Sequence, residues 1–233
     1  MQAKWEVFYD KFIVYDGWET VVDGLIATLQ IAVSGLLIGI VLGTLIAAAK
    51  VVPKTNFVAK FLSVICDIYV GFFRGTPIVV QLLIGYFVLF PALGVQMKAL
   101  NAAIAIFGMN SGAYISEIMR SGIQSVDPGQ LEASRAVGLS FSVSMIKVVI
   151  PQAIKNILPT LGNEFIVLIK ETSVASFITV VDLTKAFKDI ASSNYEYIIP
   201  YCMLALVYLV LVVIITLGLK LLERRLAKVD RSR

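Results

Sequence analysis

The chain has 233 residues, of which 58% are hydrophobic and 15% are charged, and its net charge is +4. Soluble domains carry about 25% charged residues, so this composition excludes an ordinary soluble domain and is typical of an integral membrane protein. The absence of histidine excludes histidine-based catalysis and histidine–metal sites. The basic residues lie near the ends of apolar stretches rather than in one patch, which indicates membrane topology and no nucleic-acid partner.

The first predicted element is a short segment, residues 1–20, that precedes the first span. Its aromatic side chains recur at helical spacing, at Trp5, Phe8, Tyr9 and Phe12. This pattern predicts an amphipathic helix that lies in the membrane interface. The first span is predicted at Gly24–Ala49, which holds no charge and is about long enough to cross a bilayer.

The second hydrophobic region, from Phe57 to Phe90, is too long for one simple span and is interrupted at residues 75–77. Its first half places polar side chains on one helical face, at Lys60, Ser63, Asp67 and Arg74. Its second half begins at Ile78 and is apolar. The pattern therefore predicts a helix with a polar face, a break and an apolar continuation. A third span is predicted from about Leu100 to Ile118.

A fourth span is predicted at Ile150–Ile169, although Pro159 and Glu164 interrupt its apolar character. Polar side chains recur along it every three or four residues, at Gln152, Asn156, Thr160 and Asn163. Such a stripe is typical of a helix that lines a cavity inside a bundle. The fifth span is predicted at Tyr197–Leu222. The fold class is therefore all-α and integral to the membrane, with a transmembrane domain at residues 21–223 and a basic tail at residues 224–233.

The distribution of lysine and arginine predicts the topology of these spans. An N-terminus outside and a C-terminus in the cytoplasm put most of these residues inside, including Lys50, Lys54 and Arg233, and few outside. The loop at residues 126–151 is then cytoplasmic. The basic tail is interpreted as an anchor to the lipids of the cytoplasmic leaflet.

The loop at residues 126–151 carries the signals of a helix–turn–helix. An N-cap, a proline that suits the first helical position and a capping-box-like partner occur at Asp127, Pro128 and Gln130. The first helix is predicted from Pro128 to Val137 and ends at Gly138. Ser140 is placed to cap a second short helix that runs toward Pro151.

The string EASRAVGLS in this loop, followed by IPQA, resembles the signature loop of ABC importer permeases, with Ser134 where that motif usually has alanine. The strings FRGTP, AYISEIMRSGI and LGNEFIVLIKETSVAS resemble the polar amino acid subfamily, which imports histidine, arginine, glutamine, cystine and related substrates. The resemblance covers nearly the whole chain after about Gly17. The resemblance implies a type I ABC importer permease, multi-pass in the bacterial cytoplasmic (inner) membrane, that works by alternating access.

The chain contains no G-x-x-x-x-G-K-[ST] phosphate loop, so we predict that it is not an enzyme and holds no cofactor or metal. The resemblance implies a cytoplasmic coupling helix that docks on a separate ATP-binding subunit, present in two copies, which would bind ATP and Mg. It also implies a second permease chain, identical or paralogous, and an extracytoplasmic solute-binding protein. The residues implied in coupling are Gly129, Glu132, Ala133, Ser134, Ala136, Gly138 and Leu139.

Asn163 and Glu164 lie in the middle of the fourth predicted span and are candidates for substrate contact, because polar groups within spans are costly and usually functional. Glu164 would face an amine or a cationic side chain of a polar amino acid, and Asn163 would form a hydrogen bond beside it. The alternative is that Glu164 pairs with Arg74 or Lys170 and holds the bundle together.

Arg74 and Thr76, at the helix break, are further substrate-binding candidates, because a broken helix offers polar groups and a gate near a cavity. The alternative is a packing kink in which Asp67 neutralises Arg74. Glu117 and Arg120 are interpreted as an i,i+3 surface pair or as a support for the docking loop.

Two alternative functions remain open at the level of the sequence. A subunit of an ion-coupled secondary transporter or channel would also carry polar residues within its spans, but it would have no use for the loop at residues 126–151. A membrane-embedded enzyme is disfavoured because the sequence offers no pair of nucleophile and base and no cluster of metal ligands.

Overall fold

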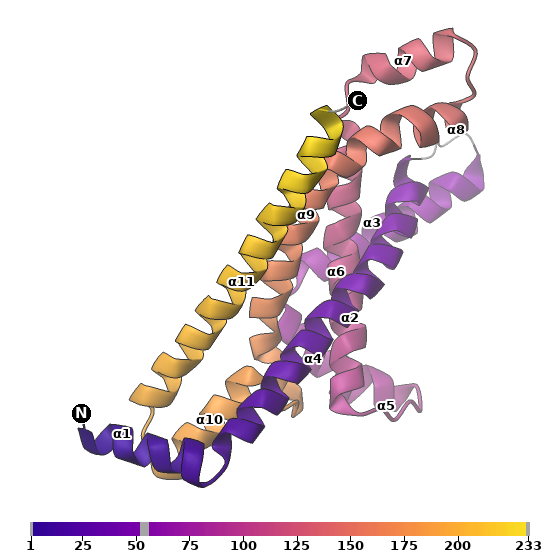
Figure 1. The fold of residues 1–233 in the computed structure, drawn as a ribbon. Coiled ribbons are helices and arrows are strands. Elements are labelled where there is room, and N and C mark those ends of the chain that lie inside the picture. Colours follow the sequence, from indigo (N-terminus) through magenta and orange to yellow (C-terminus); the bar gives the residue numbers. More distant parts are fainter. Residues whose placement is uncertain (1, 52–55, 232–233) are drawn as a thin grey trace. The chain divides into compact units, whose positions relative to one another are not determined.

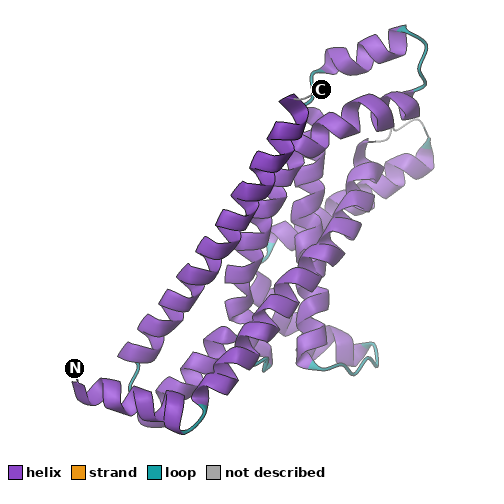
Figure 2. Ribbon diagram, viewed as in Figure 1, coloured by secondary structure: helices purple, strands orange, loops and turns teal. Residues whose placement is uncertain are grey.

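The computed structural model describes residues 2–51 and 56–231, and all regular structure in this part of the chain is helical (Figure 2). The all-α prediction is therefore confirmed. Lys54 and Arg233, which contributed to the topology prediction, lie outside the described residues. The chain divides into two compact units. The first unit comprises Met1–Leu37, Thr76–Gly108 and Phe165–Ile215, and the second comprises Ile38–Gly75, Met109–Glu164 and Thr216–Arg233.

Figure 1 shows the order of the helices along the chain. They are α1 (Gln2–Tyr9), the π-helix η1 (Asp10–Val14), α2 (Gly17–Val51), α3 (Phe57–Gly75), α4 (Ile78–Ile84), the π-helix η2 (Gly85–Leu89), α5 (Phe90–Ala92), α6 (Ala99–Gln124), α7 (Pro128–Ala136), α8 (Phe141–Ser144), the π-helix η3 (Met145–Val149), α9 (Ile150–Glu171), the 3-10 helix η4 (Thr172–Ile178), α10 (Leu183–Asn194) and α11 (Ile198–Arg231). The predicted basic tail is helical as far as Arg231, because α11 continues through it.

Three helical stretches among the described residues are long and apolar enough to cross a membrane, at Gly17–Val51, Phe141–Ile178 and Ile198–Arg224. The helices on either side of the break at residues 76–77 would together supply a fourth. The third predicted span coincides with α6, which is helical throughout but is not among these apolar stretches. Its buried Asn110, Ser111 and Ser116 lower its apolar character. The number of about five spans therefore stays a prediction.

In the first unit, the N-terminal segment packs against α10 and the start of α11. Phe8 is 6% exposed and belongs to a core cluster with Leu183, Phe187 and Ile199, whereas Trp5 lies exposed on the same helix. A helix is therefore present in this segment, and part of its aromatic face contacts protein, while its place in the membrane interface stays a prediction. The helix that contains the first predicted span begins at Gly17 rather than at Gly24.

In the second unit, α2 and α6 approach closely where glycines face small or branched side chains. A Cβ atom placed on Gly39 would lie 2.6 Å from the Ser111 hydroxyl oxygen, and one on Gly43 would lie 2.9 Å from the Ser116 backbone nitrogen. Small residues at such positions let spanning helices pack without a gap. On another face of α6, the Tyr69 hydroxyl of α3 donates a hydrogen bond to the Met109 carbonyl at 2.5 Å.

The two π-helical turns η2 and η3 each end two residues before a proline, at Pro91 and Pro151. Proline lacks an N–H and its ring clashes with the carbonyl four residues earlier, so a wider turn before it lets the helix continue. This corrects the predicted second short helix of the loop. The helix that begins at Phe141 does not stop near Pro151 but continues through η3 into α9.

Candidate functional site

The loop of the second unit folds as a capped helix that reverses onto the next one. An Asp127 carboxylate oxygen accepts a hydrogen bond from the Gly129 N–H at 2.8 Å, which caps the N-terminus of α7. At the other end Gly138 has a φ of +92°, and its N–H bonds the Arg135 carbonyl at 3.0 Å. The Ser140 hydroxyl accepts from the Val143 N–H at 3.4 Å at the start of α8. The predicted caps at Asp127, Gly138 and Ser140 are therefore confirmed.

One local prediction differs from the structure. The sequence predicts that Gln130 completes a capping-box-like pair with Asp127, but its side-chain oxygen accepts a hydrogen bond from the Gln152 side chain of α9 at 3.4 Å. The Gln130 side chain therefore contributes to holding α7 against α9, and Asp127 caps the helix through Gly129.

An apolar cluster attaches α7 to the rest of the second unit. Leu131 of α7 and Val126 before it pack with Val149, Ala153 and Ile157 of η3 and α9. Figure 1 shows α7 and α8 beside each other, and η3 and α9 follow α8 along the chain. Because α7 rests on a packed cluster, a push on α7 would be transmitted directly to α9.

Most of the predicted coupling residues lie exposed on the surface of this loop, namely Gly129, Glu132, Ala133, Ala136, Gly138 and Leu139. Ser134 is the exception, because it is 8% exposed and its hydroxyl donates to the Leu131 carbonyl at 2.8 Å. The serine that replaces the usual alanine thus faces away from the open surface. The sequence prediction did not include Val137, which is 79% exposed next to Gly138 and adds an apolar side chain to this surface.

Next to the loop, Glu117 of α6 joins three helices of the second unit. Its carboxylate accepts hydrogen bonds from Lys50 of α2 at 2.8 Å and from Arg120 at 2.5 Å, and the Lys50 Nζ atom also lies 2.9 Å from Asp67 of α3. The predicted i,i+3 pair of Glu117 and Arg120 is present. It is not a surface pair, however, because the Glu117 side chain is only 16% exposed.

Arg74 of α3 reaches the same carboxylate from the other side. Its guanidinium nitrogen lies 4.0 Å from Glu117, and the guanidinium carbon lies 5.4 Å from the centroid of the Tyr114 ring. The alternative in which Asp67 neutralises Arg74 is corrected, because Asp67 pairs with Lys50 instead. The physical reason is that α6 supplies the Glu117 carboxylate to Arg74 and α2 supplies the Lys50 ammonium to Asp67.

A cavity of about 490 Å³ opens beside Arg74, and we call it the polar cavity after the polar residues in its wall. Its walls include Glu117, Ser121 and two residues of the predicted polar stripe on α9, Asn156 and Thr160. The Asn156 amide donates to the Ser125 hydroxyl at 2.8 Å, so part of this stripe faces the end of α6. The prediction that the stripe lines a cavity is thus supported at these two positions.

The other substrate candidates lie elsewhere. Asn163 is exposed and Glu164 is half-buried on α9, and neither is among the described residues that line the polar cavity. Thr76 belongs to the first unit, where its hydroxyl accepts a hydrogen bond from the buried Gln81 side chain at 2.9 Å. The structure therefore brings Arg74 into a cavity with the polar stripe and does not bring all four candidates into one cavity.

The family model for binding-protein-dependent transport system inner membrane components matches residues 25–228. The chain belongs to this family. A putative glutamine transport system permease protein of Rickettsia bellii is 37% identical to this inner membrane component over 206 residues, which cover 88% of this chain and 92% of that protein. An arginine transport system permease protein of Bacillus subtilis is 38% identical over 210 residues, which cover 90% of this chain and 94% of that protein.

Solved structures agree with this assignment. An amino acid ABC transporter with histidines contains a chain that is 39% identical to this inner membrane component, with a TM-score of 0.83, and the match covers 93% of this chain and 98% of that one. A chain of an inward-facing methionine ABC transporter is 19% identical with a TM-score of 0.75 over 88% of this chain and 95% of that one, and it supports the fold. The predicted ABC permease family and its type I importer fold are confirmed over the alternative of a secondary transporter.

Proposed function

We propose that this inner membrane component forms the translocation path of an ATP-driven importer of polar amino acids. The observation that carries the proposal is the capped helix α7, which exposes Glu132, Ala133 and Ala136 on a surface suited to a partner protein. The relatives named above support the substrate class, since they are described as glutamine and arginine permeases and the solved transporter contains histidines. These names differ, so they support the class of polar amino acids rather than one member.

The proposed assembly contains two copies of an ATP-binding subunit, which bind ATP and Mg, and a second permease chain that is identical or paralogous. An extracytoplasmic solute-binding protein delivers the amino acid. The N-terminus lies outside and the C-terminus in the cytoplasm, which puts α7 on the side where ATP is available.

Coupling follows from how α7 is held. When the ATP-binding subunits close, they carry the two α7 helices of the paired permeases with them. The cluster of Leu131 with Val149, Ala153 and Ile157 transmits this displacement to α9. Because a packed interior transmits strain instead of absorbing it, the shift of α9 moves the spans between inward-facing and outward-facing arrangements.

The amino acid needs polar partners along this path, because its ammonium and carboxylate groups cannot cross an apolar core unpaired. We assign Glu164 to the substrate amine or cationic side chain and Asn163 to a hydrogen bond beside it. Arg74, whose guanidinium faces the polar cavity, is assigned to a carboxylate, and Thr76 contributes at the helix break. ATP hydrolysis takes place in the partner subunit, and this chain carries out no covalent chemistry.

The test is uptake of labelled arginine, glutamine and histidine by proteoliposomes that contain the complete importer with ATP inside. We expect uptake that requires ATP and persists when ionophores abolish all ion gradients. Uptake that follows an ion gradient without ATP would favour a secondary transporter instead.

A single variant tests the substrate assignment in the same assay. Glu164→Gln should lower uptake of the cationic substrate most strongly, while the complex still assembles and hydrolyses ATP. Glu19→Gln, which changes an exposed carboxylate at the start of α2, is the matched control. Unchanged affinity and rate in Glu164→Gln would contradict the substrate role and leave the structural ion pair as the explanation.

A further inference from the structure

An apolar groove of about 620 Å³ lies beside α7, and the proposed transport path does not use it. All of it belongs to the second unit. Ala47 and Ala48 of α2 form one wall, Met119 of α6 contributes to the lining, and Ile146 and Ile154 lie on the helix that follows the loop. Thr44 and Ser142 are the only polar residues among the described residues that line it, and the Thr44 hydroxyl donates to the Ile40 carbonyl at 2.6 Å.

The position of the groove indicates that hydrocarbon chains, rather than water, fill it. Most of its lining belongs to Gly17–Val51 and Phe141–Ile178, which are two of the stretches apolar enough to span a membrane. Water does not occupy a cavity that offers it no polar partners. The volume falls in the range of about 300–1,000 Å³ that is usual for small-molecule sites. Ile146 and Ile154 are 64% and 46% exposed, so the groove has an open apolar rim.

Apolar walls alone do not distinguish a bound lipid from the surrounding bilayer, because lipid tails are as apolar as leucine. A specific lipid site needs a space that the neighbouring side chains leave unfilled. It also needs a polar or charged group that selects the lipid head group. The small side chains of Ala47, Ala48 and Ala153 provide the open space.

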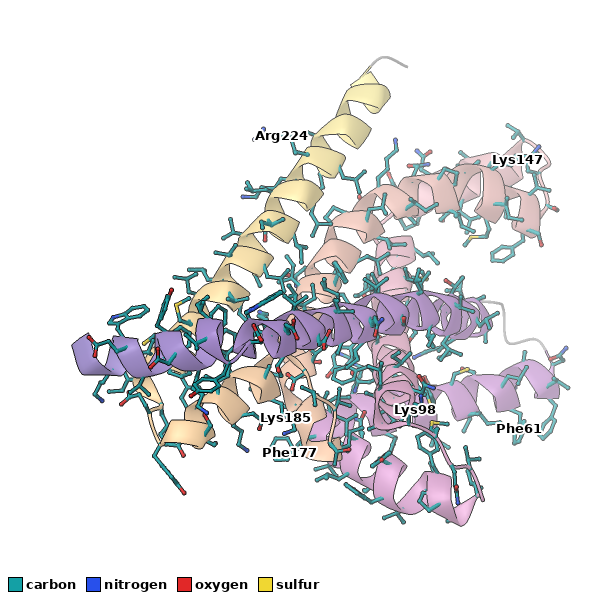
Figure 3. The ribbon with its side chains drawn as sticks, turned by 60° about the horizontal axis from the view of Figure 1, so that its bottom comes forward. Phe61, Lys98, Lys147, Phe177, Lys185 and Arg224 are labelled. Atoms are coloured by element: carbon teal, nitrogen blue, oxygen red, sulfur yellow. The ribbon has the colours of Figure 1, made fainter. Side chains whose placement is uncertain are left out.

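Charge beside the groove provides the polar feature. Lys147 directly follows the groove residue Ile146 within η3, its side chain is exposed, and no carboxylate pairs with it in the described part of the chain. Figure 3 shows Lys147 on the end of the helix that follows the loop. Basic residues at a membrane surface attract anionic lipids. Lys50, which precedes the groove residue Val51, is already engaged by Glu117 and Asp67.

We propose that this groove binds one anionic phospholipid, with an acyl chain between α2 and the helix that follows the loop and its head group at Lys147. The proposed orientation of the chain places this lipid in the cytoplasmic leaflet. The choice of leaflet rests on that orientation, whereas the binding site itself does not. Met145, Ala153 and Ile157 line the groove and also belong to the cluster that holds α7. The bound lipid therefore packs against the same residues that connect α7 to α9.

The experiment is native mass spectrometry of the assembled importer, extracted in detergent from membranes that contain both phosphatidylglycerol and phosphatidylethanolamine. The wild type should retain one phosphatidylglycerol for each copy of this chain. Ala48→Trp fills the groove from an exposed position and should lose most of the retained lipid. Leu45→Trp is the matched control on the same helix, because Leu45 is 63% exposed and is not part of the groove lining, and it should retain the lipid.

The head-group assignment has its own variant. Lys147→Gln should reduce the preference for phosphatidylglycerol over phosphatidylethanolamine by about fivefold, as expected for one basic residue near a membrane surface. A complex that retains lipid but imports no amino acid would contradict the proposed function and leave this proposal standing.

Three results would overturn the lipid proposal. One is equal lipid retention in the wild type and in Ala48→Trp. Another is a loss of lipid in Leu45→Trp as large as in Ala48→Trp, because lipid would then be held by the general surface of α2. The third comes from a photoreactive amino acid at position 154, where we expect adducts with lipid. Adducts with the second permease chain would show that a protein covers the groove.

Discussion

The Lys50 Nζ atom donates a hydrogen bond to Glu117 Oε1 at 2.8 Å, and this contact joins the end of α2 to α6. Both side chains are largely buried, with 14% and 16% of their surface exposed. Glu117 also accepts from Arg120, and Lys50 also contacts Asp67 on α3. With Arg74 of α3 at 4.0 Å, one carboxylate therefore compensates cations from three helices.

Replacing Glu117 by Gln keeps the size of the side chain and removes its charge. Lys50 and Arg120 would then lose a shared counter-ion in a largely buried position. Removal of one partner of a fully buried ion pair costs about 3–5 kcal/mol, and this partly exposed site should cost about 1–3 kcal/mol. Thermal unfolding of the purified permease in detergent measures the loss.

The control for this variant is an exposed ion pair in the first unit. Lys185 and Asp189 on α10 lie 2.8 Å apart at i,i+4 spacing, and such pairs contribute about 0.3–0.5 kcal/mol. Lys185→Met should therefore have a smaller effect than Glu117→Gln. Equal effects of the two variants would show that the buried cluster contributes no more than a surface pair.

The close approach of α2 and α6 gives a second prediction. A Cβ atom on Gly43 would lie 2.7 Å from a methyl carbon of Ile115 and 2.9 Å from the backbone nitrogen of Ser116, which cannot move without shifting α6. Gly43→Ala should therefore destabilise the protein by about 1–3 kcal/mol, as overpacking does. The same thermal unfolding assay measures it.

Gly71 on α3 is the matched control for Gly43, because both are helical glycines but a Cβ on Gly71 would meet nothing within 4 Å. Gly71→Ala should be neutral or stabilising by up to about 1 kcal/mol, since alanine has the higher helix propensity. If both variants lost stability equally, helix propensity or the membrane, rather than packing on α6, would control these positions.

The local structure of the loop could be predicted from the sequence because its signals act over a few residues. Asp127 caps a helix through a neighbour two positions away, and Gly138 supplies a positive φ that other residues adopt at a cost. The role of Glu117 could not be predicted fully in this way. Its nearest partner in α6 was evident from the i,i+3 spacing, but Lys50 is far away in the sequence and only the packing of α2 on α6 brings it near.

The continuation of α9 through Pro151 was missed for a related reason. A proline predicts a helix end when the helix has α geometry, but the π turn at Met145–Val149 removes the clash. No residue type signals a π turn by itself. The helix that contains the first span began earlier than predicted because residues 17–23 carry charge, and an apolar pattern alone marks only the part of a helix that enters the bilayer.

Asp182 gives a prediction about pH. Its side chain is buried in the first unit, outside the apolar stretches, and it caps α10 by accepting from the N–H groups of Thr184 and Lys185. Burial raises the pKa of its carboxyl above the usual range, and the hydrogen bonds from the backbone lower it by less. The folded protein therefore retains this proton to a higher pH than the unfolded chain does.

The sign of the effect follows from the protons bound. In the unfolded chain the Asp182 carboxyl has a pKa of about 3.9. Above that pH the folded state still holds the proton, until the pH reaches its own raised pKa. The contribution of Asp182 to stability is therefore complete at low pH and is lost as the pH rises through the folded pKa. In Asp182→Asn this dependence should disappear, whereas in the exposed Asp189→Asn it should remain. Parallel curves of melting temperature against pH for the wild type and Asp182→Asn would contradict the prediction.

The last prediction concerns Gly138, which ends α7 with a φ of +92°. A Cβ at this position would meet nothing within 4 Å, so the cost of Gly138→Ala is backbone strain, about 1–2 kcal/mol, and not a clash. We expect the end of α7 to relax away from its present conformation. Uptake by the reconstituted importer should then fall by about tenfold, the equivalent of about 1.4 kcal/mol, while ATP hydrolysis continues.

Two further variants separate coupling from general strain. Gly138→Asn should be milder, because asparagine tolerates positive φ better than alanine does. Gly94→Ala introduces similar strain in the first unit, in the turn between α5 and α6, where φ is +71° and a Cβ would also meet nothing within 4 Å. It should leave the ratio of ATP hydrolysed to amino acid imported unchanged. If Gly138→Ala and Gly94→Ala changed this ratio equally, the surface of α7 would have no special part in coupling.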